Sequence, residues 1–176
     1  MKKVLSLALV LVLVFSLSAC SKTSSGSSDL KFGQVEYAAH GTKSFAVTSV
    51  VLQGDKIAVA YIDEFQVLPK EGTTGVPNSD SDFGANFADA AQQLASKRVN
   101  DAYYSAMMSE KAGATVTIVN NFEAIESFAE GKTITELEAA INGKTSEEIL
   151  DAVSGATLVD TSGYIQSIIE AAKAAK

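Results

Sequence analysis

The chain has 176 residues, of which 47% are hydrophobic and 20% are charged, a composition typical of a globular protein. It has 14 basic and 21 acidic residues, which gives a formal net charge of −7 at pH 7. An acidic surface repels phosphate groups, so binding to nucleic acid is excluded as a function class. One histidine and one cysteine leave no ligand set for a zinc or haem-type metal site, and we expect no metal.

Catalysis by a side-chain nucleophile is also hard to assemble from these residues. A Ser/His/Asp or Cys/His site would have to be built around the single histidine, His40, whose place beside Gly41 indicates a surface loop. Neither G-x-G-x-x-G nor a phosphate-binding G-x-x-x-x-G-K-[ST] sequence is present. A self-contained enzyme is therefore not the favoured interpretation.

Residues 1–20 have the layout of a secretory signal peptide, with two lysines, an apolar run from Val4 and small residues before Cys20. The run is shorter than the ~20 residues that a membrane-spanning helix needs. The sequence "LSAC", Leu17 to Cys20, resembles the lipobox of bacterial lipoproteins. We therefore expect Cys20 to be the lipidated N-terminus of a mature protein that is anchored to the outer face of the cell membrane. An ordinary signal peptide with an incidental cysteine is the alternative.

The segment after the cysteine, residues 21–29, is rich in serine and lacks large apolar side chains. Such a segment behaves as a flexible tether with an end-to-end reach of roughly 15 to 18 Å. Residues 30–176 have an ordinary globular composition and the length of one domain. Loss of the signal peptide removes Lys2 and Lys3 and no acidic residue, so the mature charge becomes −9.

Two runs rich in β-branched and aromatic residues flank the turn sequence "QGDK" and predict a hairpin of strands over 44–52 and 56–67. Two prolines and several glycines then predict a long surface loop over 69–82, which is either a connector or a binding loop. Helical spacing of Phe87, Ala91, Leu94, Ala95, Ala102 and Ala106 predicts one long helix over 83–111 that ends at Gly113. A short strand is expected over 115–119.

Four further helices are predicted between residue 120 and the end of the sequence. The first is capped by Asn120 or Asn121, and the next two begin with the capping-box pairs Thr135/Glu138 and Thr145/Glu148. The last is capped by Thr161 or Ser162 and buries Ile165, Ile168, Ile169 and Ala172. Strands early and helices late predict an α+β fold, a single domain with a small antiparallel sheet and several helices.

The sequence "DAVSGAT", Asp151 to Thr157, interrupts two of these helices with small side chains. Thr157 carries a hydroxyl that can be esterified, and Gly155 and Ala156 leave room for a bulky nucleotide to approach. The N–H groups at the start of the next helix would favour a phosphate there. A tight Gly-Ala turn without a cofactor is the alternative interpretation.

"DAVSGAT" matches the pattern D-x-x-[ST]-G-A-[ST] at every fixed position, and chance gives such a match in a chain of this length about once in a thousand. The pattern resembles the site at which a flavin transferase joins FMN to a threonine by a phosphoester bond. With "GDKIAVAYIDEF", "VPNSDSDFGANF" and "TSGYIQSIIEAA", the chain is similar to the FMN-binding domain of small secreted lipoproteins. The same domain occurs in flavinylated subunits of ion-pumping NADH:quinone and ferredoxin oxidoreductases. In those subunits Thr-Ser usually follows the attachment threonine closely, whereas "LVD" intervenes here.

This resemblance implies an FMN-binding-domain-like fold that carries covalent FMN on Thr157, with Ala156, Gly155, Ser154 and Asp151 completing the site. Asp151 would serve recognition by the transferase. The expected function is electron transfer outside the cell, with a membrane quinol or NADH oxidoreductase as electron donor. Aromatic candidates for the flavin ring are Tyr164, Tyr103 and Phe83, although core packing explains each of them as well.

Two other functions remain open at this point. One is a non-catalytic surface lipoprotein that binds a small ligand or a protein, with "DAVSGAT" serving only as structure. The other is a precursor whose signal peptide releases a hydrophobic signalling peptide, for which "LVFSLSA" before Cys20 would be the source.

Overall fold

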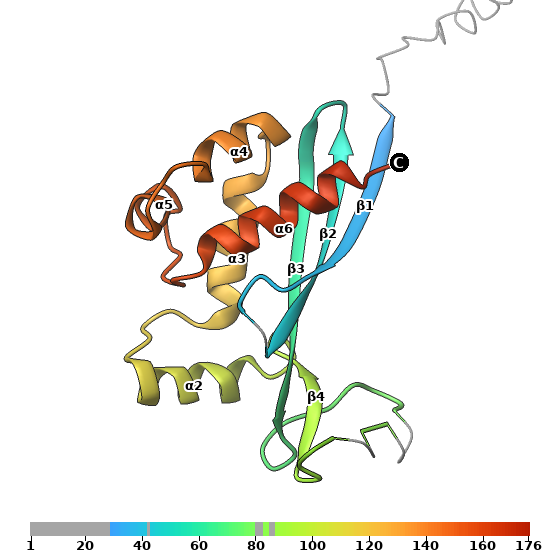
Figure 1. Ribbon diagram of the computed structural model, residues 1–176, viewed down its shortest axis with the longest axis vertical. Coiled ribbons are helices and arrows are strands. Elements are labelled where there is room, and N and C mark those ends of the chain that lie inside the picture. Colours follow the sequence, from blue (N-terminus) through green and yellow to red (C-terminus); the bar gives the residue numbers. More distant parts are fainter. Residues whose placement is uncertain (1–28, 42, 80–82, 85–86) are drawn as a thin grey trace, which may run out of the picture.

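Four antiparallel strands form one sheet, and they are joined in the order in which they occur along the chain (Figure 1). They are β1 (Leu30–Tyr37), β2 (Ser44–Gln53), β3 (Lys56–Pro69) and β4 (Gln92–Ser96). The structure is a computed structural model that describes residues 29–41, 43–79, 83–84 and 87–176. Cys20, the segment before it and all but the last residue of the expected tether lie outside the described residues.

The helices of the described residues lie on one side of this sheet, and two of them pack directly on it (Figure 1). They are α2 (Asp101–Ala112), α3 (Ile118–Ala129), α4 (Ile134–Ile141), α5 (Ser146–Ala152) and α6 (Thr161–Lys173). Helix α6 packs on β1 and β2, α3 packs on β3, and α4 and α5 pack on α6. The predicted α+β domain with a small antiparallel sheet is confirmed. Among the described residues no helix is long and apolar enough to cross a membrane.

The predicted hairpin is confirmed as β2 and β3, which pair from Ser44 with Gln66 to Gln53 with Lys56. Gly54 forms the turn with φ 67°, a conformation that glycine adopts without the steric clash of a side chain. Strand β1, which the sequence pattern did not predict, pairs with β2 along its whole length. Apart from Pro69, which ends β3, no helix or strand lies among the described residues of the predicted loop over 69–82.

The predicted long helix over 83–111 is wrong. Residues 92–96 form β4, which pairs with the second half of β3, and the helix begins only at Asp101. The pairing provides backbone hydrogen bonds that override the helix preference of alanine, glutamine and leucine. Ala102 and Ala106 are exposed, and the residue that α2 buries is Tyr104. Gly113 ends this helix in the left-handed conformation, as predicted.

The expected strand over 115–119 is also wrong, because α3 begins at Ile118. Thr117 is its N-cap, and its side chain accepts a hydrogen bond from the Asn120 backbone N–H. The cap is therefore neither Asn120 nor Asn121. A threonine N-cap satisfies an otherwise unpaired N–H group, which favours the helix over the strand that the β-branched residues suggest.

Helix starts in the last third of the chain follow the capping-box rule in two places. Thr145 and Glu148 form the predicted box, whereas the other box is Thr133 with Glu136 and not Thr135 with Glu138. Hydrogen bonds from Thr133 and Thr145 lower the pKa of Glu136 and Glu148, respectively. The residue before α6 is Asp160, which makes no side-chain cap bond, so the predicted cap by Thr161 or Ser162 is wrong.

Helix α6 lies unusually close to β1 and to the turn that follows it. A Cβ atom on Gly33 would be 2.0 Å from the Ala171 carbonyl oxygen, and one on Gly163 would be 2.2 Å from the Ala39 carbonyl oxygen. Glycine at both positions allows this approach. The contact at Gly163 brings the β1–β2 turn against the start of α6, next to the "DAVSGAT" segment.

The core lies between the sheet and the helices α3 and α6. It contains Ile62 of β3, Ile125 of α3 and the predicted residues Ile165, Ile168, Ile169 and Ala172 of α6. Burial of an isoleucine side chain stabilises a protein by about 1.5–3 kcal/mol. The core also contains polar side chains, and most of these lie at the site described next.

Candidate functional site

The "DAVSGAT" segment joins α5 to the start of α6. Gly155 has φ 92°, a value that disfavours any other residue. Ala156 is buried, and its backbone N–H donates to the Val153 carbonyl at 3.1 Å. The expectation that both Gly155 and Ala156 leave the backbone uncovered is therefore right for Gly155 and wrong for Ala156, whose methyl group belongs to the core.

Thr157 is exposed and is held by Asn121 of helix α3. Its backbone N–H donates to Asn121 Oδ1 at 2.6 Å, and its hydroxyl donates to the same oxygen at 3.3 Å. Asn121 is buried, and its Nδ2 group donates to the Thr117 carbonyl at 2.9 Å. Because both ends of the amide are bonded, its orientation is fixed. Asn121 thus sets the position of Thr157 from a place 36 residues earlier in the chain.

Thr157 lies on the wall of a pocket of about 290 Å³ between α2, the start of α3, the β1–β2 turn and the start of α6. Apolar atoms make up most of the surface of the wall, and polar side chains lie among them. The polar and aromatic residues of the wall are His40, Lys97, Tyr104, Ser105, Thr115, Asn121, Thr157, Asp160 and Tyr164. Small-molecule sites of proteins typically have this composition and begin at about this volume.

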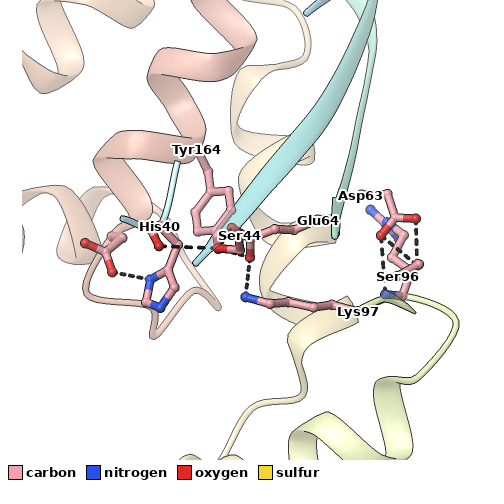
Figure 2. Close-up of polar contacts among 9 residues, drawn as sticks. His40, Ser44, Asp63, Glu64, Ser96, Lys97 and Tyr164 are labelled. Atoms are coloured by element: carbon pink, nitrogen blue, oxygen red, sulfur yellow. Dashed lines mark hydrogen bonds and ion pairs between the residues drawn. The ribbon is translucent and has the colours of Figure 1, made fainter. Parts of the chain in front are cut away.

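A buried polar network lies behind this wall (Figure 2). The Glu64 carboxylate, fully buried, accepts hydrogen bonds from Ser44 Oγ at 2.9 Å, from Tyr164 Oη at 2.7 Å and from Lys97 Nζ. Burial, followed by the charge of Glu64, raises the pKa of Tyr164. The phenol therefore stays protonated and donates. Lys97 also lies over the ring of Tyr104, with Nζ 4.6 Å from the ring centroid.

A second pair of polar side chains, His40 and Asp160, lies at the rim of the pocket beside the β1–β2 turn. His40 Nδ1 lies 2.5 Å from Asp160 Oδ2, and both side chains are nearly half exposed. His40 is thus a surface residue, as its sequence context predicts, and it belongs to the pocket. The pair joins the turn after β1 to the residue before α6.

A further group of charges lies beside the network, at the junction of β3, β4 and α3. Ser96 Oγ donates to both oxygens of Asp63, at 2.8 and 2.7 Å, a contact that Figure 2 also shows. Arg98 pairs with Glu126, and its guanidinium lies 4.5 Å from the ring centroid of Tyr61. Burial raises the pKa of Glu126 in spite of the hydrogen bonds from Ile62 and Arg98. These groups fix the strand ends next to the pocket.

The structure brings only part of the predicted site together. Of the five motif residues only Thr157 lines the pocket, whereas Ser154 lines a shallow hollow against α3. Asp151 is an exposed residue of α5, a position that a delivering enzyme could contact. Of the three aromatic candidates Tyr164 lines the pocket and is also core, while Tyr103 and Phe83 are not among the residues of the wall.

The start of α6 differs from the expectation in one respect. The backbone N–H of Thr161 donates to the Leu158 carbonyl at 3.0 Å, and that of Gly163 donates to the Asp160 carbonyl at 2.9 Å. Two of the N–H groups expected to favour a phosphate are therefore already bonded within the chain. The Asp160 carboxylate at the same place further disfavours an anion.

The residues that hold Thr157 and form the polar wall were not predicted, namely Asn121, Lys97, Glu64 and Tyr104. The sequence contains one indication of them, since Asp63 and Glu64 introduce two acidic residues into a strand rich in apolar residues and Lys97 follows the next strand. A buried carboxylate requires a cation or several donors. Within the described residues no group of three or more His, Cys, Asp or Glu side chains could hold a metal ion.

Comparison of the chain with models of protein families, with curated proteins and with solved structures gives no match. The functional argument therefore depends on the motif and on the geometry of the pocket.

Proposed function

We propose that this protein is a membrane-anchored, extracytoplasmic flavoprotein that carries electrons through FMN attached to Thr157 by a phosphoester bond. One observation supports this most: the terminal threonine of a complete flavinylation motif lies, exposed, on the wall of a pocket with mainly apolar walls. A hydroxyl in that position can be reached by a transferase from outside, and a ring attached to it can enter the pocket.

The described residues suit a flavin in three respects. The pocket has a mainly apolar wall that can receive a planar ring. Tyr104 and Tyr164 provide aromatic surface, and Lys97 provides hydrogen-bond donors. Asn121 holds Thr157 by its backbone N–H, so the attachment point is fixed before the cofactor arrives.

Attachment requires an activated flavin nucleotide and a flavin transferase as partners. The new bond joins Thr157 Oγ1 to the flavin phosphorus, the bond from that phosphorus to the leaving group breaks, and the hydroxyl loses its proton. The protein gains the mass of one FMN less one water. Thr161, a rival acceptor, is buried, and its hydroxyl donates to the Leu158 carbonyl at 2.6 Å. This hydroxyl is therefore less accessible to a transferase than that of Thr157.

Bound FMN would supply one- or two-electron transfer, while the protein supplies attachment, orientation and electrostatics. The electrons would come from a membrane quinol or NADH oxidoreductase, which is oxidised as the flavin is reduced, and would pass to an external acceptor. The lipid anchor at Cys20 would keep the protein beside such a donor. A covalent bond prevents loss of the cofactor outside the cell.

Intact-mass measurement of the protein coexpressed with a flavin transferase tests the proposal. We expect a yellow protein whose peptide containing Thr157 carries the added mass. Thr157→Ala should abolish the label, and Thr157→Ser, which keeps the hydroxyl, should retain part of it. A label on Ser154, Thr161 or Ser162, or no label in the presence of active transferase, would contradict the assignment.

The second candidate is a surface lipoprotein that binds a small ligand reversibly. The pocket favours it as well, because a cavity with apolar walls and a few polar groups can hold a ligand without a covalent bond. An apoprotein that stays unmodified in its native host would support this function. The third possibility, a signalling peptide cut from "LVFSLSA", concerns residues outside those that the structure describes.

A further inference from the structure

The buried lysine of the pocket wall is the feature that the proposed function does not yet explain. The side chain of Lys97 is 1% exposed, and it pairs with a Glu64 side chain that is 0% exposed. Removal of two charges from water costs several kcal/mol per ion, and replacement of a buried pair by apolar residues is often neutral or stabilising. Stability alone therefore gives little reason to place a lysine here.

Glu64 is held more firmly than a simple ion pair requires. Ser44 and Tyr164 donate to its two oxygens, from β2 and from α6, in addition to Lys97. The carboxylate is thus fixed by groups from β2, from α6 and from the segment after β4, and it fixes the ammonium group of Lys97 in turn (Figure 2). The network defines where the positive charge lies.

The Lys97 ammonium group has more N–H donors than it uses with Glu64. It carries three N–H groups, and among the described residues its hydrogen-bond acceptor is Glu64 Oε2. The Tyr104 ring lies against the same group. Of the described residues that line the pocket, Lys97 is the only lysine or arginine, and His40 at the rim is engaged with Asp160. One fixed cation therefore borders an otherwise mainly apolar cavity.

We propose that Lys97 binds the acceptor-bearing edge of the planar heteroaromatic ring that this pocket receives, with Glu64, Ser44 and Tyr164 as positioning residues. This inference rests on the proposed function, in which the ring is a flavin and the edge is the pyrimidine side with its ring nitrogen and carbonyl oxygens. A charge-assisted hydrogen bond at this edge selects rings that accept hydrogen bonds there over apolar rings of the same shape.

The same contact has a consequence for electron transfer. Reduction of a flavin by two electrons with uptake of one proton adds one negative charge, which resides on the pyrimidine edge. A fixed cation beside that edge favours the reduced form. Lys97 therefore raises the midpoint potential of the bound flavin.

The test compares Glu64→Gln with the double variant Glu64→Gln/Lys97→Met, so that neither variant contains a buried carboxylate without a partner. The two proteins differ only in the ammonium group. Each full chain is purified in detergent, with a thermal melt as the check of folding. Riboflavin binding is measured for the unmodified proteins, and the midpoint potential is measured for flavinylated proteins with dithionite and redox dyes. Lys31→Met, which removes an exposed lysine of β1, is the charge-matched control.

We expect riboflavin to bind about tenfold more weakly to the double variant than to Glu64→Gln, the change expected for loss of one charge-assisted hydrogen bond. The potential of the double variant should be lower than that of Glu64→Gln, and Lys31→Met should match the wild type. Equal affinity and equal potential in the two compared variants would overturn the inference.

A measurement on the unmutated chain covers the case in which a variant does not fold. In protein with ¹⁵N-labelled lysine, riboflavin should shift the side-chain ammonium signal of Lys97, and an unchanged signal at saturation would overturn the inference. The proposed function fails separately, by the absence of added mass on Thr157. Reversible riboflavin binding that depends on Lys97 would support this inference even in that event.

Discussion

The backbone N–H of Thr157 and the side-chain oxygen of Asn121 lie 2.6 Å apart, across 36 residues of sequence. This bond ties the loop before α6 to the first turn of α3. Since the Asn121 amide is buried and bonded at both ends, it behaves as a rigid support for the residue that we expect to be modified.

We predict that Asn121→Ala lowers the fraction of protein that a flavin transferase modifies in a fixed time several-fold. Without the amide the Thr157 loop loses its fixed position, and the buried groups left unpaired destabilise the fold by about 1–3 kcal/mol. Intact mass gives the modified fraction. Asn120→Ala is the matched control, because the neighbouring Asn120 is exposed. Equal labelling of the two variants at equal folded fraction would show that Asn121 has no positioning role.

Gly155 provides a second test of the loop. Its φ of 92° lies in the region that side chains rarely adopt, and left-handed backbone disfavours a non-glycine residue by roughly 1–2 kcal/mol. We predict that Gly155→Val is both destabilised and poorly flavinylated. Gly143→Val, at a φ of 71° between α4 and α5, should be destabilised to a similar degree and flavinylated normally. Poor labelling of both variants would indicate that lower stability, and not the shape of the loop, causes the loss.

The β2–β3 hairpin and α6 could be predicted from the sequence because their determinants are local. The hairpin has β-branched runs on both sides of a Gly-Asp turn, and α6 has isoleucines at helical spacing. Strand β4 has no such pattern. Its sequence "QQLAS" prefers a helix, and it is a strand only because β3 extends far enough to pair with it.

Strand β1 was missed for a similar reason. Gly33 interrupts its pattern, and the requirement for glycine there comes from the Ala171 carbonyl of α6, which lies far along the sequence.

The residues of the candidate site also divide into those with a local sequence pattern and those without one. Thr157 could be found from a contiguous motif, whereas Asn121, Lys97 and Glu64 acquire their roles only through contacts between distant elements. Local patterns contain no information about such contacts.

The lipid anchor is tested by Cys20→Ser. Without the thiol no lipid can be attached, and the protein should be released to the medium or remain unprocessed with its signal peptide. Fractionation of cells followed by mass measurement distinguishes these states. A processed variant that stays in the membrane fraction at the wild-type level would contradict the lipoprotein interpretation.

We further predict that the domain folds without flavin. The core residues of α3, α6 and the sheet pack on one another. The protein therefore does not need the cofactor to form its hydrophobic core. Circular dichroism of protein made without the transferase should show helix and strand, with a cooperative thermal transition. A random-coil spectrum would mean that FMN is part of the core.

The last prediction concerns the pH dependence of stability, which depends on Tyr164. Burial, followed by the Glu64 carboxylate, raises the pKa of this phenol above its ordinary value of 10.0. Titratable groups that face it or its hydrogen-bond partner are Glu64, Lys97, Tyr104 and Asp160. Above pH 10 the unfolded chain releases the phenol proton while the folded protein keeps it. The unfolded state then binds fewer protons, and the free energy of unfolding falls as the pH rises.

For one such group the fall is about 1.4 kcal/mol per pH unit, beginning near pH 10, and the contribution is fully present below that pH. Tyr164→Phe has no phenol proton to lose. We expect it to be less stable than the wild type at pH 8, by about 1–3 kcal/mol for the lost buried hydrogen bond, and to lose stability less steeply between pH 10 and 11.5. Urea unfolding at a series of pH values measures both effects, with Tyr103→Phe as the control outside the network. Equal slopes for the wild type and Tyr164→Phe would mean that Tyr164 does not hold its proton in the folded state, and that the Glu64 network is not closed as described.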